Sequence, residues 1–163
     1  MEAWLDWYWH VAELLGLELA YQNRFSELPG AWDGLGLYFN VTWTDSEADF
    51  PDRPSTRLQG QAETVGNLAL SYEKGGFSGR LSLNYNSEYL LEIGSEAAAD
   101  IYIDEHVQLD FSANQRINDR LRVFVELINL TDEPLRVYEG FVNRPIQNEE
   151  YSWWGTIGLK VDF

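Results

Sequence analysis

The chain has 163 residues, the length of one domain that can bury a sizeable core. Its 27 acidic and 11 basic residues give a formal charge of −16, which argues against a nucleic-acid partner because phosphates attract basic proteins. It has no cysteine, which excludes a disulfide framework, and no apolar run of the roughly 18 to 20 residues that a membrane-spanning helix needs.

Residues 1–14 form an apolar N-terminal segment with one acidic stripe. Glu2, Asp6, His10 and Glu13 recur at spacings of four, four and three, which would place them on one side of a helix. We interpret the segment either as a short helix that caps the sheet or lies in the membrane interface, or as a strand remnant. It has no basic start and no small-residue cleavage site, so no export signal is visible in this chain.

Residues 15–163 form the second predicted unit, a β-barrel domain. Apolar and polar side chains alternate there with a period of two, as in Leu15, Leu17 and Leu19, which is typical of strands with one apolar face. The alternation predicts seven strands, which cover residues 15–25, 35–43, 67–73, 77–85, 107–114, 121–127 and the C-terminal stretch that begins near 154.

The connections between these strands are of two kinds. Residues 26–34, 73–76 and 117–120 are short and rich in turn formers, whereas 44–63, 86–106 and 129–151 are long and acidic. Alternate connections of an up-and-down sheet lie at opposite ends, so all the short turns would share one end. Short turns at one end and long loops at the other are the form of an outer-membrane barrel.

Aromatic side chains gather near the predicted strand ends. The set comprises Tyr21, Phe25, Trp43, Tyr72, Tyr85, Tyr89, Tyr151 and Trp153. Amphipathic rings prefer the headgroup level, and a membrane barrel displays them as girdles. The alternative is that they fill the core of a soluble barrel, because alternation does not say which face points inward.

The sequence "DIYIDEH" brings Asp100, Asp104, Glu105 and His106 close together, and oxygen-rich loops bind Ca²⁺. It lacks EF-hand spacing, so we interpret it as a solvated acidic loop. Two histidines without cysteine argue against zinc. We find no positioned nucleophile and no phosphate-binding glycine loop, and therefore expect no enzyme, no cofactor and no metal.

Several stretches resemble the last strands of TonB-dependent outer-membrane receptors. They are "LGLELAYQNRFSELPGAWDGLGLYFNVTWTDSEA", "NLALSYEKGGFSGRLSLNYNSEYL", "VFVELINLTDEPLRVYEG" and the final "GLKVDF". In that ending, Gly158, Val161 and Phe163 are similar to the assembly signal that the barrel-assembly machinery reads. The family takes up siderophores and other scarce nutrients, which implies that Arg136, Tyr138, Arg144 and Tyr151 in the last long loop contact an anionic chelate.

The resemblance also shows what is missing. The family has an N-terminal plug, a box that contacts the energising protein, and barrels of about 22 strands. We therefore expect an outer-membrane fragment that is not transport-competent alone, whose partners are lipid, the assembly machinery and, to complete the barrel, further copies of itself.

We predict an all-β fold, an antiparallel up-and-down meander of seven or eight strands that closes or nearly closes into a membrane-type barrel. The alternative function is a small soluble barrel, natural or engineered, that binds an apolar ligand. The high negative charge is compatible with that solubility.

Overall fold

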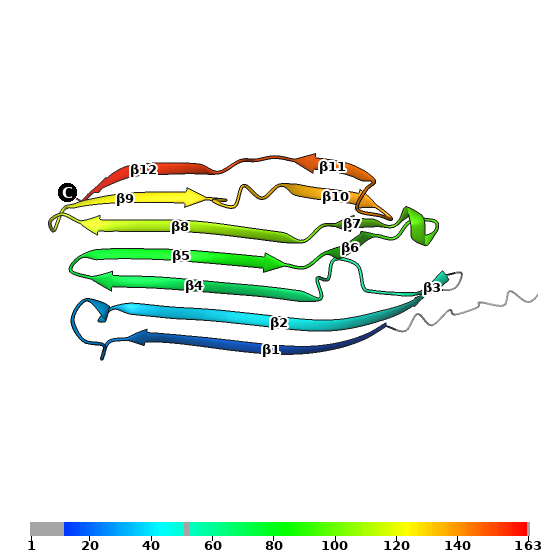
Figure 1. Cartoon of the computed structure of the whole chain (residues 1–163), viewed down its shortest axis with the longest axis horizontal. Helices are drawn as coiled ribbons and strands as arrows, with labels where there is room; N and C mark the ends of the chain where they lie inside the picture. The colour runs from blue at the N-terminus through cyan, green and yellow to red at the C-terminus, as the bar shows by residue number, and fades with distance from the viewer. Residues whose placement is uncertain (1–11, 51–52, 163) are drawn as a thin grey trace, which may run out of the picture.

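The computed structural model describes residues 12–50 and 53–162, which form two antiparallel β-sheets (Figure 1). The larger sheet has eight strands, seven in the order β1-β2-β4-β5-β8-β9-β12 and β3 beside β2. These are β1 (Ala12–Phe25), β2 (Leu35–Phe50), β3 (Arg53–Thr56), β4 (Thr64–Lys74), β5 (Phe77–Asn86), β8 (His106–Arg116), β9 (Leu121–Ile128) and β12 (Trp154–Val161). The predicted all-β meander is confirmed.

The smaller sheet has four strands in the order β11-β10-β7-β6. They are β6 (Tyr89–Glu92), β7 (Ile101–Ile103), β10 (Leu135–Glu139) and β11 (Pro145–Glu149), and two short 3-10 turns are η1 (Gly30–Trp32) and η2 (Ala97–Ala99). This sheet lies beyond the ends of β5, β8, β9 and β12, so the long connections predicted as loops contain strands of their own (Figure 1).

The N-terminal helix hypothesis concerns residues 1–14. Residues 1–11 lie outside the described part of the chain, and residues 12–14 begin strand β1. The described residues contain no α-helix, and none of their helical turns has the length and apolarity to cross a membrane.

The predicted closure into a barrel is wrong for the described residues, which form an open sheet. β1 and β12 lie at opposite edges and do not pair (Figure 1). Every step from β1 to β12 is antiparallel, and the path has seven strands, so its first and last strands run in the same direction. Joining them directly would require a parallel pair, whose hydrogen bonds differ from those of the rest of the sheet.

The strand register places the apolar side chains on one face. Tyr21 pairs with Phe39, Phe39 with Leu68, Leu68 with Leu83, and Leu83 with Leu109. Paired residues project from the same face, so apolar rows run across the sheet. This face is uncovered: the exposed fraction is 71% for Leu17 and 78% for Ile157. The prediction of one apolar face shared by all strands is confirmed.

The opposite face is polar. Asn40 and Asn67 face each other there, with the Asn67 amide donating to the Asn40 side-chain oxygen at 2.7 Å. Ala69 on this face is fully covered, because it pairs between the larger Tyr38 and Ser82. The main sheet thus holds almost none of the buried core.

Candidate ligand-recognition layer

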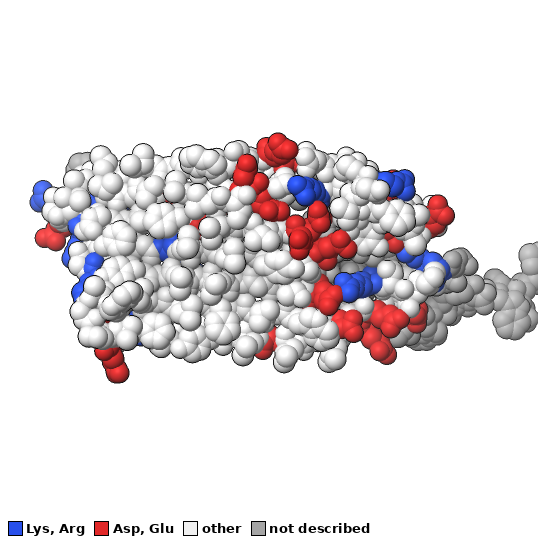
Figure 2. All heavy atoms as spheres, in the orientation of Figure 1, with Lys and Arg blue, Asp and Glu red and all other residues white. Residues whose placement is uncertain are grey.

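The three long connections form one folded unit, which we call the loop layer: residues 44–50, 53–63, 87–105 and 129–153. Apart from Ala69 and the glycines Gly34, Gly36 and Gly79, all the buried residues of the described chain lie in it, namely Ser46, Ala48, Leu90, Asp100, Asn129, Val137 and Tyr138. Asp and Glu gather toward this end of the molecule, and Lys and Arg line the opposite, short-turn end (Figure 2). The layer therefore has a core that the main sheet lacks.

A buried ion pair joins the first long connection to the second. The Arg53 guanidinium donates two hydrogen bonds to the Asp100 carboxylate, at 2.9 and 2.6 Å, in a bidentate arrangement. Asp100 is 1% exposed and Arg53 is 14% exposed. The hydrogen bond from Arg53 holds the pKa of the Asp100 carboxyl below its usual 3.8, against the opposing effect of burial.

Asp100 also receives contacts from its own connection and from the third. The Gly94 amide donates to its carboxylate at 2.9 Å, and the Gly140 amide donates to its backbone oxygen at 2.7 Å. Gly140 has φ of +67°, and a Cβ there would lie 2.4 Å from the Ala98 oxygen. Only glycine fits this close approach, which brings the third connection against the second.

Two tyrosines extend the same contact between the second and third connections. The rings of Tyr102 and Tyr138, which are paired on β7 and β10, stack with centroids 5.4 Å apart. The Tyr138 hydroxyl donates to the Glu88 carboxylate. Burial, with this hydrogen bond, raises the pKa of Tyr138 well above its usual value of 10. The hydroxyl therefore stays a donor at ordinary pH.

Asn129 fixes the start of the third connection. It has φ of +58°, a left-handed conformation that asparagine tolerates better than most residues. Its side chain accepts from the Glu133 amide at 2.9 Å and donates to the Glu133 and Ser152 backbone oxygens at 3.0 and 3.4 Å. The sequence "NLTDEP" is thus a turn whose asparagine holds the two ends of the connection together.

All four predicted ligand-binding residues lie in the third connection. Arg136 and Tyr138 are both on β10, Arg144 is in the turn after it, and Tyr151 follows β11. Arg144 pairs with Glu139 at 3.0 Å, and Arg136 approaches Asp104 at 3.9 Å. Both arginine side chains are more than half exposed, and Tyr151 is 59% exposed, whereas Tyr138 is buried within the layer.

The acidic residues of "DIYIDEH" are not brought together as ligands. Asp100 pairs with Arg53, and Asp104 accepts from the Glu105 amide at 3.0 Å and lies 3.9 Å from Arg136. In the part of the chain that the structure describes, no three His, Asp or Glu side chains gather where they could hold a metal ion.

The predicted assembly signal lies on β12, except for Phe163, which is outside the described residues. Val161 pairs with Leu121 and projects from the apolar face. Gly158 pairs with Phe124, and a Cβ on it would lie 2.4 Å from the ring. The glycine therefore makes room for an aromatic ring that departs from the alternation of its strand.

Sequence reasoning missed Arg53 and Glu88. Each meets its partner across about 50 residues of chain, and neither lies in a recognisable motif. A cation within a long acidic connection was the only available signal for Arg53.

A family model described as "TonB dependent receptor-like, beta-barrel" matches residues 11–130. The match covers the strands from β1 to β9 and the first two long connections. No curated protein and no solved structure matches the chain.

Proposed function

Because the chain belongs to the TonB-dependent receptor β-barrel family, we propose that it forms the C-terminal strands of a bacterial outer-membrane receptor. Lipid would cover the apolar face, and the loop layer would face the outside of the cell. The observation that carries this proposal is the uncovered apolar face, which extends across all seven strands. In water that surface would be unfavourable, at about 25 cal/mol for each Å².

The height of the apolar band supports a membrane location. On β2 the band extends from Leu35 to Trp43, close to the ~9–11 residues of a membrane-spanning strand. Beyond Trp43 the same face carries Asp45 and Glu47, which would be costly in hydrocarbon. The change from apolar to acidic side chains would mark the outer membrane surface.

The two free edges indicate that other strands complete the barrel. An unpaired backbone group in lipid costs several kcal/mol, so β1 and β12 each need a neighbour. Because these strands run in the same direction, only an odd number of intervening strands gives antiparallel pairs throughout. The described residues enclose no lumen, so the chain alone would not transport, and its β12 edge is where the assembly machinery would engage it.

For the loop layer we propose the recognition of an anionic nutrient chelate, such as a siderophore. Arg136, Arg144 and Tyr151 are exposed on one connection of a layer with its own core. Tyr138 would support them from within the layer, because its ring and hydroxyl already contact Tyr102 and Glu88. A preformed layer lowers the entropy cost of binding.

The test is to refold the purified chain in buffer, in neutral detergent and with lipid vesicles, and to measure far-UV circular dichroism and molar mass. We expect a strand spectrum only with detergent or lipid, and a mass above that of one chain. A folded, cooperative monomer in plain buffer would contradict the proposal and favour the soluble barrel that binds an apolar ligand.

A second measurement separates the location from the binding role. Vesicle flotation reports lipid insertion, whereas titration with a ferric chelate of net negative charge reports recognition. We expect Arg136→Gln with Arg144→Gln to weaken the second without changing the first. Loss of flotation in that variant would instead assign the two arginines to folding.

A further inference from the structure

The short-turn end of the polar face has two groups of cations that differ in their partners. Arg24 pairs with Glu73 at 3.0 Å, and Lys74 lies 3.4 Å from Asp33. By contrast, the cations of β8, β9 and β12 at this end belong to none of the ion pairs between described residues. They are Arg116, Arg122 and Lys160, which we call the cation row.

The register places the three cations side by side. Arg116 pairs with Arg122, and Arg122 pairs with Lys160, so all three project from the polar face on neighbouring strands. Neighbouring strands lie about 4.8 Å apart, and like charges directly opposite each other destabilise a sheet. An anion bound across the row would remove this repulsion.

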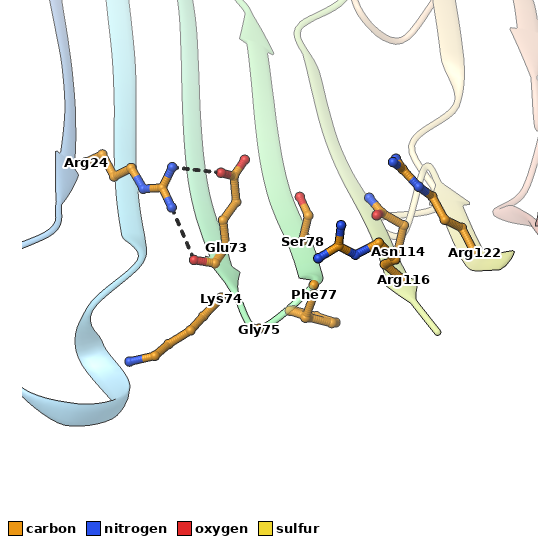
Figure 3. Close-up of a pocket in the computed structure, with 10 residues that line it drawn as sticks. Arg24, Glu73, Lys74, Gly75, Phe77, Ser78, Asn114, Arg116 and Arg122 are labelled. Atoms are coloured by element: carbon orange, nitrogen blue, oxygen red, sulfur yellow. Dashed lines mark hydrogen bonds and ion pairs between the residues drawn. The ribbon is translucent and has the colours of Figure 1, made fainter. Parts of the chain in front are cut away.

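The surroundings of the row supply neutral donors. A hollow of about 350 Å³ is lined by Arg116, Arg122, Asn114 and Ser78, with the Arg24–Glu73 pair on its far side. Figure 3 shows the Arg116 side chain extending toward Ser78, and Asn114 lying between Arg116 and Arg122. Asn114 and Ser78 are paired across β5 and β8, and neither side chain makes a hydrogen bond to another described residue.

We propose that the cation row and its hollow form an oxyanion site for a phosphate or diphosphate group. Two guanidinium forks match the oxygens of a phosphate, and the amide and hydroxyl supply further donors. The site lies on the face opposite the apolar one, which assigns it a soluble ligand and not a lipid headgroup. It is distinct from the loop layer, which lies at the other end of the strands, and only its assignment to a soluble ligand rests on the proposal that lipid covers the apolar face.

The probe is inorganic pyrophosphate, titrated by calorimetry into the full chain in whichever condition gives the strand spectrum. The test variant is Arg116→Gln with Arg122→Gln, and the matched control is Arg57→Gln with Arg80→Gln, which removes the same charge from residues that do not line the hollow. We expect saturable binding that weakens about tenfold or more in the test variant and changes little in the control.

A second readout distinguishes a folding defect from a lost site. Without pyrophosphate, the test variant is expected to unfold at a higher urea concentration than the native chain, since the repulsion is gone. Added pyrophosphate should stabilise the native chain and not the variant. Equal weakening of binding in both double variants, or no saturable binding to the folded native chain, would overturn the proposal.

A third arm tests the source of the phosphate. Phosphatidylglycerol added to neutral micelles presents the same chemistry on a lipid. Stabilisation by this lipid that pyrophosphate does not compete away would overturn the assignment to a soluble ligand. Competition by pyrophosphate would support it.

Discussion

The main sheet and the loop layer use the same strand geometry and hold together in opposite ways. The sheet relies on backbone pairing and leaves its apolar rows uncovered, with Leu15 at 69% exposed. The loop layer encloses Leu90, Val137 and the Arg53–Asp100 pair. The first region therefore takes its stability from whatever covers it, whereas the second carries its own core. This difference predicts that the two regions can be destabilised separately.

The largest expected effect is on the loop layer. Arg53→Met leaves the Asp100 carboxylate buried without its cation, and the loss of one partner of a buried pair costs about 3–5 kcal/mol. Amide hydrogen exchange should therefore accelerate in β7 and β10 and remain slow in β4 and β5. Arg57→Met is the control, since its more exposed pair with Glu63 contributes at most about 1 kcal/mol. Equal acceleration in β4 would show that the regions unfold as one.

The next effect should be confined to the main sheet. Leu70 projects from the apolar face, and its neighbour Ser71 projects from the polar one. Leu70→Lys is expected to cost about 2–4 kcal/mol when the chain is folded in lipid vesicles, as a cation placed in hydrocarbon does. Ser71→Lys should cost much less. Urea unfolding in vesicles measures both, and similar midpoints for the two variants would argue against a lipid-covered face.

A smaller effect is expected at Asn129, where the loop layer joins the sheet. Asn129→Gly keeps the left-handed backbone and loses the side-chain hydrogen bonds, at a cost of about 2 kcal/mol. Asn129→Ala adds about 1 kcal/mol of backbone strain. The difference between the two unfolding free energies isolates the backbone contribution. If alanine were tolerated as well as glycine, the positive φ would not be under strain.

The smallest expected effect is a loss of loop-layer stability at acidic pH. The pKa of the Asp100 carboxyl is lower in the folded chain than its usual 3.8. Its contribution to the stability of the loop layer is therefore complete above pH 3.8. It is lost as the pH falls through the lower, folded pKa, when the unfolded chain binds the proton first. Protection of the β7 amides, taken relative to unstructured amides at the same pH, should fall over this acidic range in the native chain, and the Arg53→Met variant should show a weaker dependence. A fall of this protection on the alkaline side instead would contradict this sign.

The alternation of side chains was sufficient to predict the main sheet. Leu35, Leu37 and Phe39 alternate with polar neighbours because one face of β2 is apolar, and period two records that directly. The prediction ended β2 at Trp43, whereas the strand continues to Phe50. Backbone pairing persists there, but acidic side chains replace the apolar ones. The alternation of apolar and polar side chains therefore ends before the strand does.

The interior of the loop layer was not predictable in the same way. Arg53 and Asp100 are 47 residues apart, and their pairing depends on how two connections fold back over the sheet. Phe124 breaks the alternation of apolar and polar side chains along β9 for a comparable reason. The space that its ring fills is provided by Gly158 on another strand. Contacts of this kind form between residues that are distant in the sequence, so the local periodicity of side chains does not predict them.

The position of Asp100 also restricts how the exposed end can diversify. The first connection reaches it through Arg53 and the third through Gly140, so a change in any one connection must remain compatible with the other two. We therefore expect covariation among these positions in relatives. Insertions should be tolerated at the tip beyond Gly140, around the exposed Phe141 and Val142, where new length would alter the outer surface and leave this junction intact.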